Sequence, residues 1–207
     1  PEGKETDFIT DYYRYSFVLE SKTEDIFGEY EFKGILAPDG LNTIDGTYLK
    51  KDGKLYFIYS AYMYTGYQNL QICEMENPYT LKTDENGKHN CTVLSKPDLY
   101  WEKRGWSVNG APAVLYKDGE IYLLYSASGF SSGGYCMGML TFDGKDVMDA
   151  DNWAKSRKRV HYCGIKSRGE RHREKRAVYG ISCRKTEGDI GNPEGGMASK
   201  PFLYKAN

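Results

Sequence analysis

The feature that most restricts the fold of this chain is a hairpin-like stretch that occurs twice. Residues 45–61 read DGTYLKKDGKLYFIYSA, and residues 106–127 read WSVNGAPAVLYKDGEIYLLYSA. In both copies an Asp-Gly pair separates two runs rich in aromatic and branched residues. This pattern predicts a tight β-hairpin, because both turn residues tolerate a positive φ. In the second copy we expect the strands over 113–116 and 121–126.

Further short strands are expected around the two hairpins. Each is bounded by Pro, Gly, Asn or Asp, and they cover residues 15–21, 29–36, 69–75, 91–94 and 136–142. The last of these follows the 69–75 strand at the same spacing of about 66 residues that separates the hairpins. A long, fixed period of short strands predicts radial repetition of four-stranded sheets, that is, a β-propeller. A β-sandwich is the structural alternative, because it also has turns every 8–12 residues.

Composition and charge restrict the function. The formal net charge is −1, so neither nucleic acid nor an acidic membrane is favoured as a partner. No run approaches the roughly 20 apolar residues of a membrane span. The polar N-terminus matches no signal peptide, and a secreted and a cytoplasmic location both stay open, as does the oligomeric state. The histidines show no metal-ligand spacing, so no metal or cofactor is expected; they are His89, His161 and His172.

The five cysteines are odd in number and contain no CxxC pair, so the sequence predicts neither a zinc site nor a full disulfide framework. Cys73 and Cys136 stand inside expected strands and are interpreted as buried small hydrophobic residues. Residues 90–92 (Asn-Cys-Thr) fit a glycosylation sequon, which matters in a eukaryotic secretory setting.

Several segments, in unbroken order, resemble glycoside hydrolase family 43. They are NTIDGT, NLQICEMENPYTL, LSKPDLYWEK, GWSVNGAPAVL, and YSASG followed by YCMGMLTFDG, and together they cover about residues 14–160. The likeness is to the α-L-arabinofuranosidase-type members, which are five-bladed β-propellers. The resemblance implies an all-β fold with antiparallel four-stranded blades, of which this chain would hold about three. We expect a partial propeller domain over residues 1–163.

The resemblance also implies a reaction, the inverting hydrolysis of terminal α-L-arabinofuranosyl or β-xylosyl links in plant polysaccharides. An arabinose-containing oligosaccharide or polysaccharide would then be the partner. Inversion requires one carboxylic acid that protonates the leaving oxygen and one carboxylate that activates water. A third carboxylate raises the pKa of the acid and orients it. In this chain Asp45 matches the third, orienting carboxylate.

The general acid is missing from this pattern. Where the family reads Val-Asn-Glu-Gly-Pro, residues 108–112 read Val-Asn-Gly-Ala-Pro, so Gly110 takes the place of the proton donor. Glu102 and Glu120 are too far along the chain to replace it. The blade that carries the base would precede Pro1. Loss of a general acid lowers the rate by about 10²–10⁴-fold. We therefore expect impaired hydrolysis, with a catalytically silent carbohydrate-binding propeller as the alternative.

Sugar contacts are predicted near the ends of the propeller strands. Trp106 and Tyr135 are placed to stack on a sugar ring, and Asn109 and Ser128 to hydrogen-bond its hydroxyls. The likeness stops near residue 164, and 164–207 form a divergent basic and polar tail. For the tail the sequence leaves open a solvated or disordered segment, a reading-frame error, and a patch that binds polyanions.

Overall fold

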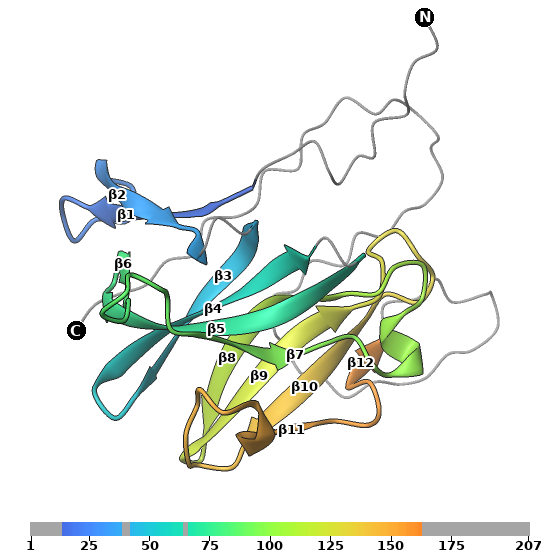
Figure 1. Cartoon of the computed structure of the whole chain (residues 1–207). Coiled ribbons are helices and arrows are strands. Elements are labelled where there is room, and N and C mark those ends of the chain that lie inside the picture. The colour runs from blue at the N-terminus through green and yellow to red at the C-terminus, as the bar shows by residue number, and fades with distance from the viewer. Residues whose placement is uncertain (1–13, 39–41, 64–65, 163–207) are drawn as a thin grey trace, which may run out of the picture.

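The structure, a computed structural model, describes residues 14–38, 42–63 and 66–162 (Figure 1). These residues form an all-β arrangement with two short 3-10 turns, η2 (Tyr100–Glu102) and η3 (Ala150–Asn152). The strands are β1 (Ser16–Ser21), β2 (Tyr30–Leu36), β3 (Thr43–Lys51), β4 (Lys54–Met63), β5 (Tyr67–Asn77), β6 (Thr80–Leu81), β7 (Cys91–Ser95), β8 (Asn109–Lys117), β9 (Glu120–Ala127), β10 (Cys136–Phe142), β11 (Trp153–Lys155) and β12 (His161–Tyr162).

Two larger sheets repeat one antiparallel plan. In the first, β3, β4 and β5 pair in order, and both β6 and β7 pair with β5. In the second, β8, β9 and β10 pair in order, and both β11 and β12 pair with β10. A separate hairpin, β1–β2, precedes them. The described part of the chain is thus a partial β-propeller of two blades and one two-stranded hairpin, where the sequence led us to expect about three blades.

The turn chemistry of the two long hairpins is confirmed. Asp52 and Gly53 have φ of 51° and 75°, and Asp118 and Gly119 have φ of 53° and 81°. Both central residues of each turn therefore lie in the left-handed region, which matches the right-handed twist of the flanking strands. The strands of the second hairpin run over 109–117 and 120–127, longer than expected from the sequence.

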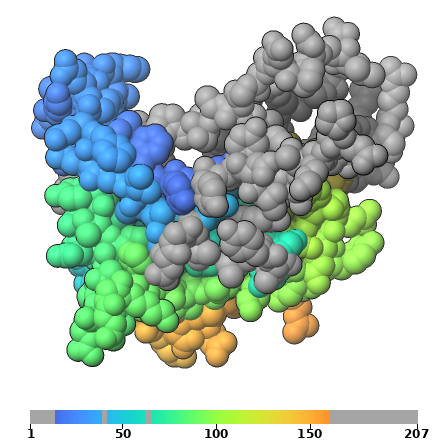
Figure 2. Space-filling model, turned by 45° about the horizontal axis from the view of Figure 1, so that its top comes forward, coloured from blue at the N-terminus to red at the C-terminus, as the bar shows by residue number. Residues whose placement is uncertain are grey.

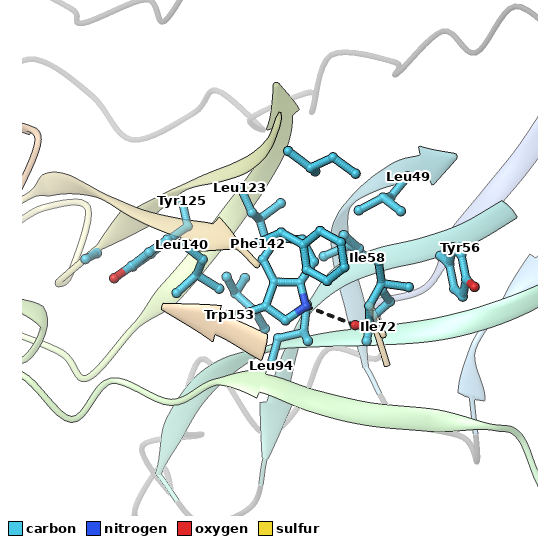
Figure 3. Close-up of a cluster of buried hydrophobic side chains, with 14 of the residues drawn as sticks. Leu49, Tyr56, Ile58, Ile72, Leu94, Leu123, Tyr125, Leu140, Phe142 and Trp153 are labelled. Atoms are coloured by element: carbon cyan, nitrogen blue, oxygen red, sulfur yellow. Dashed lines mark hydrogen bonds between the residues drawn. The ribbon is translucent and has the colours of Figure 1, made fainter. Parts of the chain in front are cut away.

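The main hydrophobic core fills the space between the two larger sheets (Figure 3). Along β9 and β10, side chains alternate between buried and half-buried positions, as the period of a strand requires. Leu123 and Leu140 thereby meet Ile58 and Ile72 from the first sheet. Trp153 stands beside Phe142 with the ring centroids 5.0 Å apart, and its indole N–H donates to the Val147 carbonyl at 3.0 Å. This core fixes the two sheets against each other.

A second core lies between the first sheet and the β1–β2 hairpin. Leu36 and the half-buried Val18 pack on Phe57 and Tyr59. The Lys33 ammonium also lies 5.9 Å from the centre of the Tyr79 ring, and in Figure 2 the blue hairpin accordingly stands directly against green residues of the first sheet. The outer face of the hairpin is apolar and exposed; its members are Phe17, Leu19, Phe32 and Ile35.

Cys73 is buried, as expected from the sequence, but it takes part in a disulfide that the sequence did not predict. Cys73 on β5 stands directly opposite Cys91 on β7, and the two form a disulfide with their Cα atoms 4.1 Å apart. The two cysteines are 18 residues apart in sequence, and they meet because of the register between β5 and β7. The spacing of cysteines along the chain does not reveal that register. Cys136 is free and buried, as expected.

Within 14–38, 42–63 and 66–162, no helix has the length and apolar character that crossing a membrane requires. The same described ranges contain no group of three or more His, Cys, Asp or Glu side chains able to hold a metal ion. The predicted tail, residues 164–207, and the end of the predicted domain at 163 lie outside the described residues.

Candidate active site

Two β-bulges stand at equivalent places in the two blades. The β3–β4 register shifts between Ile44 and Thr47, and the β8–β9 register shifts between Gly110 and Ala113. A bulge re-aims side chains by inserting residues that have no partner across the ladder. In each bulge one residue other than glycine has a positive φ, 57° at Asp45 and 45° at Ala111. The conformation that these two residues share in the repeat is unusual for L-amino acids.

The two bulges touch each other. The backbone N–H of Ala111 and the Arg14 guanidinium both lie close enough to the Asp45 carboxyl group to lower its pKa. The strands are also held side by side at their other ends, where the Tyr116 hydroxyl accepts from Lys50 N at 2.7 Å and donates to Lys50 O at 3.1 Å. Asp45, the orienting carboxylate predicted from the sequence, thus lies near Ala111, the residue after Gly110.

The pKa of Asp45 is raised above the usual value for an aspartate. The main cause is desolvation of the carboxyl group, which disfavours its charged form. Asp45 as a whole residue is nevertheless exposed. The Ala111 N–H and the positive charge of Arg14 oppose this effect, because both stabilise the carboxylate. Asp45 therefore has the electrostatic character of a carboxyl group that takes up a proton more readily than a solvated one.

Gly110 is buried at the place of the general acid. A Cβ atom added there would lie 3.1 Å from Gln68 Nε2 and 3.4 Å from Ser60 Oγ. These two side chains already bond to each other at 2.5 Å, and Ser60 Oγ donates to the Asn109 carbonyl at 3.1 Å. Since the closest neighbour is the end of a flexible amide, a side chain at position 110 requires only a small shift of Gln68. Position 110 therefore has no proton donor, and a Cβ fits there with a small shift of Gln68.

Glu102 has a structural role that the sequence did not reveal. It is fully buried, and its two carboxylate oxygens accept from Leu99 N at 2.8 Å, Asn109 Nδ2 at 2.9 Å, the Tyr125 hydroxyl at 2.8 Å and Lys155 Nζ at 3.1 Å. Burial, followed by the Glu102 charge, raises the pKa of Tyr125. With its oxygens occupied in this way, Glu102 braces the start of β8. In the sequence, the only sign of this role was that Glu102 is an acidic residue within the aromatic segment LYWEKRGW, residues 99–106.

Asn109 and Ser128, both predicted as sugar contacts, point into the protein. Asn109 is 0% exposed and Ser128 is 1% exposed. Asn109 Oδ1 accepts from Ser95 Oγ at 2.6 Å, and its Nδ2 donates to Glu102. Ser128 Oγ donates to the Trp101 carbonyl and accepts from Arg104 N, at 2.8 and 2.9 Å. Both therefore shape the edge of the site in this structure, and their contact with a sugar stays a prediction.

The two predicted aromatic contacts lie on the same edge of the second blade. Trp106 is 51% exposed and precedes β8, whereas the half-buried Tyr135 precedes β10. Asn109 and Cys136 both stand opposite Ala127, so the residues before β8 and β10 share the end of the sheet at which β9 finishes. A Cβ on Gly129 would approach Trp106 Cβ and Cδ1 to 3.4 Å, so a side chain there would crowd the indole. This end of the second blade thus carries an exposed Trp106 ring packed against Gly129.

The sequence and the structure of this chain are similar to those of several known proteins. The family model described as glycosyl hydrolases family 43 matches residues 5–176. An extracellular exo-α-(1→5)-L-arabinofuranosidase of Streptomyces chartreusis is 35% identical over 145 residues, which are 68% of this chain and 42% of that protein. The α-L-arabinofuranosidase 43 of Humicola insolens is 37% identical over 93 residues, 44% of this chain and 18% of that protein. The chain thus spans less than half the length of these relatives.

Among solved structures, that of an α-L-arabinofuranosidase from Lactobacillus brevis resembles this one with a TM-score of 0.65 and 31% identity. The likeness covers 76% of this chain and 49% of that one. An endo-arabinase of Bacteroides thetaiotaomicron has a TM-score of 0.52 at 17% identity and supports the fold alone.

Proposed function

The chain belongs to family 43 of the glycosyl hydrolases, and from that membership we propose that it recognises terminal α-L-arabinofuranosyl groups of plant polysaccharides and hydrolyses them poorly. The observation that supports this proposal is the closeness of Asp45, the predicted orienting carboxylate, to Ala111, the residue after Gly110. The proposed reaction is inverting hydrolysis of terminal α-L-arabinofuranosyl links, with β-xylosyl links as the related possibility.

The substrate class is supported by the relatives. The Streptomyces protein carries the name exo-α-(1→5)-L-arabinofuranosidase, and the structural neighbour is also an α-L-arabinofuranosidase. An arabinose-containing oligosaccharide or polysaccharide is therefore the proposed ligand, with Asp45, Trp106 and Tyr135 as its proposed contacts.

The impairment is proposed from the chemistry of the leaving group. An alkoxide leaves a sugar only when an acid protonates it, and Gly110 has no proton to give. A dinitrophenolate leaves without protonation. The base is expected on a blade that precedes Pro1, so in a chain that includes that blade and lacks only the acid, dinitrophenyl arabinofuranoside should be hydrolysed and arabino-oligosaccharides left nearly untouched.

A catalytically silent carbohydrate-binding propeller is the second candidate, favoured by the same glycine. It predicts binding of arabino-oligosaccharides, measured by calorimetry, with turnover of neither substrate. The two candidates therefore differ on the dinitrophenyl substrate alone.

The experiment uses a protein that includes the blade expected to carry the base, and it compares the parent sequence with the double variant Gly110→Glu/Ala111→Gly, which restores the family pair, and with Ala111→Gly as the matched control. On arabino-oligosaccharides the double variant should exceed both others by about 10²–10⁴-fold. On the dinitrophenyl substrate the gain should be much smaller. Rapid hydrolysis of arabino-oligosaccharides by the parent chain would overturn the proposed impairment, and absence of any binding would overturn the proposed recognition.

A further inference from the structure

One sequence triplet was left without a role by the glycosidase assignment. Residues 90–92, Asn-Cys-Thr, form the only Asn-x-Ser/Thr triplet without proline at x in the 207 residues. Such a triplet is the acceptor pattern for N-linked glycans, and it is useful only on a surface. The structure places this triplet at the start of β7, on the outer part of the first blade.

The side chain of Asn90 is exposed. Its backbone lies in the edge of the sheet, since Asn90 N donates to Lys82 O at 3.3 Å and Asn90 O accepts from Glu74 N at 3.1 Å. Asn90 Nδ2 donates to Glu74 Oε2 over 3.3 Å, the long end of the hydrogen-bond range. A glycosylated amide keeps one N–H, so this contact with Glu74 can persist after modification.

The middle residue of the triplet links it to folding. Cys91 forms the disulfide with Cys73, and Thr92 stands opposite Ile72 in the β5–β7 ladder. An enzyme that transfers a glycan must hold the Asn and Thr side chains together in its own site, which a strand locked into a ladder does not permit. Once the disulfide has formed, the triplet is fixed on β5. The modification therefore has to come before the disulfide closes.

We propose that Asn90 is an acceptor for an N-linked glycan, and that formation of the Cys73–Cys91 disulfide competes with its modification. The donor is a lipid-linked oligosaccharide of the secretory pathway. A bond forms between Asn90 Nδ2 and the anomeric carbon of the oligosaccharide, the bond from that carbon to the lipid diphosphate breaks, and one amide proton is lost to a base. Disulfides and N-linked glycans are both acquired in the oxidising secretory compartment, which makes the two sites mutually consistent.

The glycan would leave the candidate active site open. Gln68, at the start of β5, contacts the segment before β8 through a backbone bond to Ser107 O at 3.0 Å. Asn90 lies next to Glu74, six residues further along the same strand, or about 20 Å away at the rise of a β-strand. Sugar binding is therefore expected to be equal in the modified and unmodified forms.

The test uses the full chain behind a cleavable signal sequence, translated with endoplasmic-reticulum microsomes. Glycan attachment is read as a gel shift that an endoglycosidase removes, and protease protection confirms import. The parent should show one removable glycan on part of the molecules. Asn90→Gln and Thr92→Ala should lose it, whereas Asn86→Gln, at an exposed asparagine of the same loop, should keep it. Absence of a removable shift on imported parent chain would overturn the acceptor assignment.

The competition is tested by adding a reductant during translation. The glycosylated fraction of the parent should rise with reductant. Cys73→Ser keeps the triplet intact but cannot form the disulfide, so it should show the higher fraction without reductant and no response to it. Equal fractions in the parent with and without reductant, together with no change in Cys73→Ser, would overturn the competition. Since attachment precedes folding, the result does not depend on whether a variant reaches its final fold.

Discussion

Asp45 and Ala111 occupy the same place in consecutive blades, and the backbone N–H of Ala111 lies close enough to the Asp45 carboxyl group to lower its pKa. Each lies in a β-bulge and has a positive φ. The repeat therefore does more than duplicate a hairpin. It places two bulges against each other, one carrying Asp45, the predicted orienting carboxylate, and the other carrying Gly110, the predicted position of the acid. The predictions below follow from this contact and from the network around it.

Removal of the Asp45 charge should stabilise the protein in a pH-dependent manner. Because the folded-state pKa is raised, the stability associated with this group is fully present below its unfolded pKa and is lost as the pH rises through the folded pKa. Asp45→Asn should therefore gain stability relative to the parent at neutral pH and little at acidic pH, measured by urea unfolding. Asp118→Asn, at an exposed turn with a similar φ of 53°, controls for the substitution itself. An equal gain at both pH values would contradict the prediction.

Ala111→Gly should stabilise the chain. An L-residue in the left-handed region destabilises the folded state by about 1–2 kcal/mol, and glycine removes this strain. Glycine also raises the conformational entropy of the unfolded chain, which lowers the stability by about 0.4–1 kcal/mol, so the expected net gain in the free energy of unfolding is about 1 kcal/mol. Ala113→Gly, two residues later in the same strand, has no positive φ and should lose about 0.5–1 kcal/mol. Denaturant midpoints of the two variants should move in opposite directions. A loss of stability in Ala111→Gly would show that the strain at this position is absent.

The buried pair of Glu102 and Lys155 should be sensitive to loss of one partner. Lys155→Met leaves the fully buried Glu102 carboxylate without a counter-charge. The expected cost is about 3 kcal/mol, the low end for a buried pair, because Lys155 keeps 17% of its side chain exposed. Lys22→Met removes an exposed pair with Glu29 and should change the midpoint of unfolding little. Similar effects of the two substitutions would argue against a bracing role for Glu102.

The Cys73–Cys91 disulfide should contribute about 3 kcal/mol, because it closes a loop of 18 residues in the unfolded chain. A reductant should lower the stability of the parent and leave the double variant Cys73→Ser/Cys91→Ser unaffected. Peptide mapping without reduction should recover the two cysteines in one linked pair, with Cys136 alkylated only after unfolding. Alkylation of Cys73 in the folded, oxidised protein would contradict the pairing.

Particular residues show how far sequence reasoning reached. The turns at Asp52-Gly53 and Asp118-Gly119 were predicted correctly because the φ preferences of these residues act locally. The all-β class and the family followed from the repeat and from segments that keep their order. Asn109 and Ser128 were proposed as sugar contacts, yet the structure gives their polar atoms protein partners. Nothing local in the sequence distinguishes an inward from an outward amide or hydroxyl at the end of a strand.

The sequence by itself determined that position 110 has no proton donor and that two Asp-Gly hairpins recur, and it predicted Asp45 as the orienting carboxylate. These are properties of single residues or of neighbours along the chain. Only the tertiary structure decided that Asp45 meets Ala111, that Cys73 pairs with Cys91, and that Glu102 braces Asn109 and Lys155. Each of these contacts depends on strand register and on sheet packing. Those are settled by the burial of the whole core rather than by the conformational preference of any one segment.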